Sequence, residues 1–254
     1  MVRAIRANQW VIHNQALSKD QLDQLPILVF QSAARCAFDY FYFLSRPKKL
    51  QSMVKFNPEA HKAFERIRKN QPCVIVCPHL SNFDLMGYTL PLNGLDVQVL
   101  SFPNPNASYR VQNKIREKVG INVTPMTLSA FRQARNRLQK GGSILTGLDR
   151  PLENQSVDKY QPVFFGQKCA LPVAYVRMAK EANAPVILLA ATSQPDQSYR
   201  LVGSKPIWME TADDLETEVL INANRVLSIA ENIIRTYAHQ WAMFYPIWPQ
   251  YLGI

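Results

Sequence analysis

The feature that most constrains the fold is the alternation of short apolar segments with longer helix-type segments through the middle of the chain. The segment CVIVCP at 73–78 is apolar and β-branched and ends at a proline, a pattern typical of a strand covered on both faces. Comparable segments recur between stretches of helical period. The expected strands lie at 73–77, 97–102, 121–126, 143–148 and 185–192, with helices at 107–118, 128–140 and 175–183.

This order predicts one α/β domain over residues 1–254, in which helices flank a mostly parallel or mixed central sheet. No repeat or low-complexity linker divides the chain, and 47% of its residues are hydrophobic, enough for one sizeable core. Residues 1–56 form a helical N-terminal region that is a candidate for apposition to a membrane. Further expected elements are strands at 162–165 and 169–173 around a turn at Gly166, edge strands at 199–202 and 207–209, and a final helix at 213–240.

The most apolar segment, residues 25–44, is long enough for a helix of five turns and rich in aromatic residues. On a helix, Gln31, Arg35 and Asp39 fall on one narrow polar stripe, so most of the circumference should be buried. Two interpretations stay open. The helix packs into the core, or it lies at a membrane interface beside the basic residues that follow at 46–49.

The net charge of +10 is concentrated in two blocks. Residues 1–70 carry twelve Lys and Arg against five Asp and Glu, and residues 104–140 carry eight against one. This excess should attract an anionic partner through its long-range field. Anionic lipid and an acidic acyl carrier are candidates. A nucleic-acid-binding protein is the alternative, but no helix-turn-helix, RNP or zinc-finger pattern supports it, so no nucleic-acid partner is expected.

Cysteine usage indicates a reduced compartment. Cys36, Cys73, Cys77 and Cys169 lack the paired spacing of a zinc site, and no metal site is expected. The N-terminus has no apolar core region, which argues against a signal peptide. Cys77 stands two residues before His79, so a Cys/His or metal-dependent hydrolase is a second alternative.

The candidate catalytic pair is His79 and Asp84, in the run PHLSNFD at the carboxyl end of the 73–77 strand. A spacing of five residues turns about 140° on a continuous helix, so the side chains meet only if residues 80–83 fold back as a loop. The carboxylate would then hold one imidazole nitrogen and leave the other free to take a proton from a hydroxyl.

The run PHLSNFDLMGYTL resembles the HxxxxD block of the glycerolipid acyltransferase superfamily, in the form found in bacterial lipid A biosynthesis acyltransferases and the related phosphatidylinositol mannoside acyltransferases. Later segments follow in the order of that family, and the similarity spans residues 60–250. These segments are RVQNKIREKVG with Arg110 and Arg116, KGGSILTGLDRP with Asp149, VFFG, NAPVILLAAT and HQWAMFYPIWP.

The resemblance implies transfer of a fatty acyl group from acyl-CoA or acyl carrier protein to a hydroxyl of a lipid or glycolipid, with no cofactor. His79 would act as general base, and Asp84 would orient its ring. Backbone N–H groups at 81–84 would stabilise the oxyanion. Arg116, with Arg110, would bind phosphate.

The resemblance further implies that Asp149 contacts the acceptor or organises Arg150. Arg150 occupies a position where the family often has Gln. The spanning helix usual at the N-terminus of the family has no counterpart here. We therefore expect peripheral attachment to the cytoplasmic face of the cell membrane.

Overall fold

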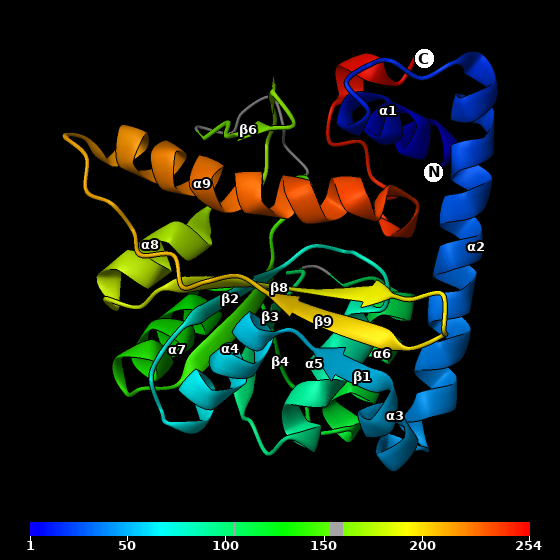
Figure 1. The fold of residues 1–254 in the computed structure, drawn as a ribbon. Helices are drawn as coiled ribbons and strands as arrows, with labels where there is room; N and C mark the ends of the chain where they lie inside the picture. The colour runs from blue at the N-terminus through cyan, green and yellow to red at the C-terminus, as the bar shows by residue number, and fades with distance from the viewer. Residues whose placement is uncertain (104, 153–159) are drawn as a thin grey trace.

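The computed structural model describes residues 1–103, 105–152 and 160–254, and it confirms the predicted α/β architecture (Figure 1). The central sheet has seven strands. In order across the sheet they are β1 (Val54–Phe56), β9 (Tyr199–Gly203), β8 (Val186–Ser193), β2 (Val74–Cys77), β5 (Ser143–Gly147), β3 (Val97–Ser101) and β4 (Asn122–Pro125). The five strands from β8 to β4 are parallel, and β9 runs antiparallel to β8.

The described residues form nine α-helices, two short 3-10 turns and a small separate hairpin. They are α1 (Val2–Ile12), α2 (Lys19–Leu44), α3 (Pro47–Met53), α4 (Pro58–Arg68), α5 (Phe83–Leu92), α6 (Ala107–Lys118), α7 (Leu128–Gln139), α8 (Ala174–Glu181), α9 (Leu215–Thr236), η1 (Ala238–Gln240), η2 (Pro249–Tyr251), β6 (Val163–Phe164) and β7 (Gln167–Lys168). In Figure 1, α2 runs along one side of the molecule, and both termini lie near its first turns.

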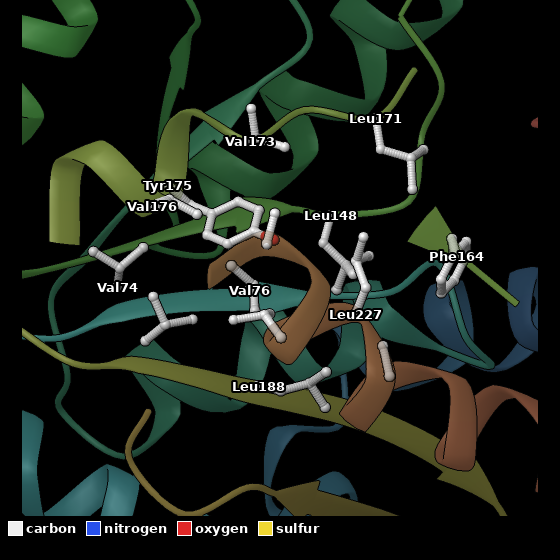
Figure 2. Packing of buried hydrophobic residues seen from close by; sticks show 14 of the residues in the cluster. Val74, Val76, Leu148, Phe164, Leu171, Val173, Tyr175, Val176, Leu188 and Leu227 are labelled. Carbon is white, nitrogen blue, oxygen red and sulfur yellow. The ribbon is translucent and has the colours of Figure 1, made fainter. Parts of the chain in front are cut away.

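Alternation of side chains along the buried strands divides the core between the two faces of the sheet. In β8, Val186 and Leu188 pack with α8 and α9, whereas Ile187 and Leu189 pack with α4 and α5. Figure 2 shows the first of these layers, where Leu188 lies near Leu227 of α9. Because both faces are covered, these strands are predominantly apolar on both faces, as in VIVC of β2 and VILLAA of β8, which is why the sequence revealed them.

Most predicted elements agree with the structure, and α6 has the predicted bounds. Six helices are preceded by an N-cap residue whose side chain accepts a hydrogen bond from a backbone N–H of the first turn. These residues are Ser18, Asn57, Asn82, Asn106, Thr127 and Asp214.

One strand was missed, and three predictions near the sheet edge and in the C-terminal part were wrong. Strand β1 was not expected, because three residues carry little periodic signal. Residues 207–209 add only a single bridge, from Ile207 to Val186, and the partner of β6 is 167–168 rather than 169–173. The long helix ends at Thr236 and is followed by η1.

The helix predicted at 25–44 exists as part of α2, but the interpretation that it packs wholly into the core was wrong. Its inner face packs on α5 and the sheet edge through Tyr40 and Phe43, and Phe30 stacks on Phe244 of the C-terminal segment. Its outer face leaves Ile27 58%, Phe38 68% and Phe41 61% exposed. Within the described residues, no helix has the length and apolar character needed to cross a membrane.

The packing of β8 predicts a large effect from one core truncation. Replacing Leu188, which is fully buried between the sheet and α9, with alanine should lower the free energy of unfolding by about 2–5 kcal/mol through lost contacts and the cavity left behind. Leu128→Ala, at a side chain 80% exposed on α7, is the control and should change it by less than about 0.5 kcal/mol. Chemical denaturation measures both, and equal losses would contradict the assigned core.

Candidate active site

The histidine at the end of β2 is held by a buried aspartate at the end of the neighbouring strand. His79 Nδ1 lies 2.6 Å from Asp149 Oδ1, and the His79 backbone N–H donates to Asp149 Oδ2 at 2.9 Å. Trp241 Nε1 donates to the same Oδ2 at 2.8 Å. Asp149 is fully buried, whereas the His79 side chain is partly exposed. The carboxylate therefore lies on the buried side of the imidazole ring.

The pairing of β2 with β5 explains why these two residues meet. Cys77 pairs with Gly147 in the parallel ladder, and His79 and Asp149 each follow two residues later. The Leu148 N–H donates to the Cys77 carbonyl, which continues the hydrogen bonding between the two strands toward His79 and Asp149. A Cβ atom at Gly147 would lie 3.3 Å from His79 Cε1, so the glycine leaves room for the ring.

The structure corrects the expectation that Asp84 orients the imidazole. Asp84 lies in the first turn of α5, and Arg116 of α6 binds its Oδ1 through Nε at 2.8 Å and Nη2 at 2.7 Å. Gln112 donates to its Oδ2 at 2.8 Å. His79 and Asp84 both line a small pocket of about 70 Å³, but the imidazole Nδ1 contacts Asp149 and not Asp84.

The predicted arginines lie in three different settings. Arg116 is buried, and its pKa is raised by Asp84 despite the opposing effect of burial, so its guanidinium is committed to an ion pair rather than open to phosphate. Arg110 is exposed near the start of α6 and donates to the Pro105 carbonyl. Arg150 stacks on Phe102, with its guanidinium carbon 3.8 Å from the ring centroid.

A cavity of about 620 Å³, here named the large cavity, opens beside His79. Its walls are mainly apolar, with Leu100, Phe131 and Val173 among them, and Arg150 and Arg177 lie on its lining. Its size falls in the range of small-molecule binding sites. It is therefore suited to a long apolar group whose reactive end lies at the imidazole.

The C-terminal segment fixes the loop that carries His79, a role that sequence reasoning missed. The Ser81 N–H donates to the Gln240 carbonyl at 2.8 Å, and the Ala242 N–H donates to the His79 carbonyl at 2.9 Å. Ser81 adopts a positive φ of 48°, a conformation that such external bonds stabilise. Because its N–H is already bonded, Ser81 does not serve as one of the expected oxyanion donors.

Cys77 is poorly suited to act as the nucleophile of a Cys/His hydrolase. Burial raises the pKa of the Cys77 thiol, and Asp149 and Asp84 raise it further, so this cysteine is a poor thiolate nucleophile. In the described part of the chain, no three His, Cys, Asp or Glu side chains are grouped in a way that would hold a metal ion.

An α/β sheet with a histidine–carboxylate contact at its strand ends and an apolar cavity beside it fits the class of acyltransferases. The comparison with known families agrees, because residues 18–250 match the sequence model described as bacterial lipid A biosynthesis acyltransferase. The match spans most of the chain, so the protein belongs to this family and is an acyltransferase of lipid A biosynthesis. Among curated proteins, none matches the chain.

The Asp84–Arg116 pair predicts a loss of stability when one partner is removed. Asp84→Ala should lower the free energy of unfolding by about 3–5 kcal/mol, because it leaves a buried guanidinium without its counter-charge. Combining Asp84→Leu with Arg116→Met should recover most of that loss. Glu65→Ala, at the exposed ion pair with Arg68, is the matched control and should leave the denaturation midpoint nearly unchanged. A double variant as unstable as Asp84→Ala would show that the pair is not the cause.

Proposed function

We propose that the protein transfers a fatty acyl group from a thioester to a hydroxyl of a lipid A precursor, with His79 as general base and Asp149 as the carboxylate that positions it. The observation that carries this proposal is the 2.6 Å contact between His79 Nδ1 and Asp149 Oδ1 beside the large cavity. Family membership supports the lipid acceptor.

In the proposed reaction, His79 Nε2 removes the proton from the acceptor hydroxyl as its oxygen attacks the thioester carbonyl. Asp149 holds the proton on Nδ1 and stabilises the imidazolium that forms. The tetrahedral intermediate then expels the thiolate, which receives the proton from Nε2. The products are the acyl ester and the free thiol, and the histidine returns to its neutral form.

The large cavity is the proposed site of the donor. Its apolar walls suit the acyl chain, and Arg150 and Arg177 supply cations for the phosphate of a pantetheine arm. Both acyl-CoA and acyl carrier protein present that arm. Arg110, exposed on α6, is a further proposed phosphate contact. Asp84 acts in this scheme as a positioning residue, since through Arg116 it fixes the start of α5 against α6.

We further propose that the protein attaches peripherally to the cytoplasmic face of the membrane through α2. The exposed aromatic residues of α2 are followed by the exposed Arg46, Lys48 and Lys49, which would meet anionic headgroups. All four cysteines are free, in keeping with a reduced compartment.

The catalytic proposal predicts how strongly each of three substitutions lowers the rate of acyl transfer. His79→Ala should lower kcat by about 10²- to 10⁴-fold, because the general base is lost. Asp149→Asn should have a comparable effect, since an amide no longer stabilises the imidazolium, and Asp84→Asn should be less severe than either. Transfer of dodecanoyl groups from dodecanoyl-CoA to a lipid A precursor measures the rates.

Asp196→Asn, at a surface loop, is the control for these variants and should match the parent protein. Circular dichroism should show that each variant is folded. If His79→Ala keeps near-parent transfer, the assigned base is wrong even though the family membership stands.

The membrane proposal predicts salt-sensitive binding to anionic vesicles. Phe38→Ser combined with Ile27→Ser should weaken vesicle binding at least severalfold, because both side chains would leave water on docking. Leu128→Ser, at a still more exposed apolar side chain on α7, is the control and should not change vesicle binding. Flotation with vesicles of anionic and neutral phospholipid at two salt concentrations measures binding. Equal binding to both lipids would remove the electrostatic part of the proposal.

A further inference from the structure

A second apolar groove, of about 460 Å³, lies between α2 and α6 on the other side of the HxxxxD loop; we name it the α2–α6 groove. Ala33, Ala37 and Phe41 line it from α2, and Val111 and Ile115 line it from α6. The two alanines are four residues apart on one helical face, so their small side chains leave space between the helices.

The polarity of the α2–α6 groove changes from one end to the other. At its inner end lie Ser81, Asn82 and Asp84, which are largely buried. At its outer end, Phe41 and Val111 are 61% and 58% exposed. A groove that is polar at its buried end and apolar at its open end matches a molecule with a polar head and a hydrocarbon tail.

The buried end of the groove reaches the proposed base. Phe83 and Asp84 line both the α2–α6 groove and the small pocket that contains His79. The rings of Phe83 and His79 lie edge to face, with centroids 4.8 Å apart. A head group seated at Asp84 and Gln112 is therefore one side chain away from the imidazole.

The open end of the groove is on α2, the helix whose outer face carries exposed aromatic residues. The large cavity, in contrast, carries Arg150 and Arg177 on its lining, which suit a phosphate-bearing donor arriving from water. We infer that the α2–α6 groove binds an acyl chain of the membrane-bound acceptor lipid and guides its hydroxyl to His79. This inference rests on the proposed function and adds the acceptor subsite to it.

The test fills the groove from α2 without changing the apolar character of the helix surface. Ala37→Phe places a ring in the groove, and Ala34→Phe places the same ring on the same helix outside its lining. With a lipid A precursor in mixed micelles and dodecanoyl-CoA as donor, Ala37→Phe should raise the acceptor KM at least 10-fold while the donor KM stays within twofold. Ala34→Phe should leave the acceptor KM within twofold of the parent. Val111→Trp, from α6, should reproduce the effect of Ala37→Phe.

A binding measurement separates this inference from the catalytic proposal. A lipid A precursor with a diazirine in one acyl chain, irradiated with the protein, should label residues 33–41 and 111–115. His79→Ala should be labelled in the same way although it does not transfer, and Ala37→Phe should reduce the label at least fivefold.

Labelling of Leu171, Val173 and Val219 in the large cavity instead would overturn the inference, as would an unchanged acceptor KM in Ala37→Phe. A donor KM that rises in place of the acceptor KM would also overturn it, because the groove would then hold the donor chain.

Discussion

The parallel pairing of β2 with β5 is the constraint on which the site depends. It sets Cys77 opposite Gly147, and continuing both strands by two residues brings His79 against Asp149. Burial of this carboxylate is tolerable because three N–H donors surround it: the His79 backbone, its ring and the Trp241 indole. A buried carboxylate with fixed donors is a rigid support for the ring, and rigidity is what a general base needs to meet a hydroxyl in one geometry.

The C-terminal segment completes this support from far along the chain. Gln240 bonds the Ser81 N–H through its carbonyl and the backbone of Ser193 through its side chain, so one residue ties the histidine loop to the end of β8. Trp241 and Trp248 are buried against Phe164 of the small hairpin. The tail is thus a structural part of the site, and its aromatic character follows from the need to cover the core beneath α9.

The site lies between two apolar spaces with different surroundings. The large cavity has arginines on its lining, and the α2–α6 groove opens on the aromatic face of α2. The Asp84–Arg116 pair stands between them and joins α5 to α6. For the proposed transfer from a water-borne thioester to a membrane lipid, the two spaces would give access from water and from the bilayer on separate sides of the site.

The sequence by itself determined the buried strands of the sheet, the helices near 107–118, 128–140 and 175–183, and the place of His79, because continuous apolar strands and turn glycines are local signals. The resemblance of its motifs to a known family also marked Asp84, Arg116, Asp149 and Arg150 as candidate site residues. Only the tertiary structure decided their partners: Asp149 rather than Asp84 holds the imidazole, and Arg116 pairs with Asp84. Likewise, the composition of α2 did not reveal which face stays exposed. Strand register and helix packing bring these residues together across 70 and 32 positions of the chain, and no local pattern encodes which distant carboxylate reaches a given ring.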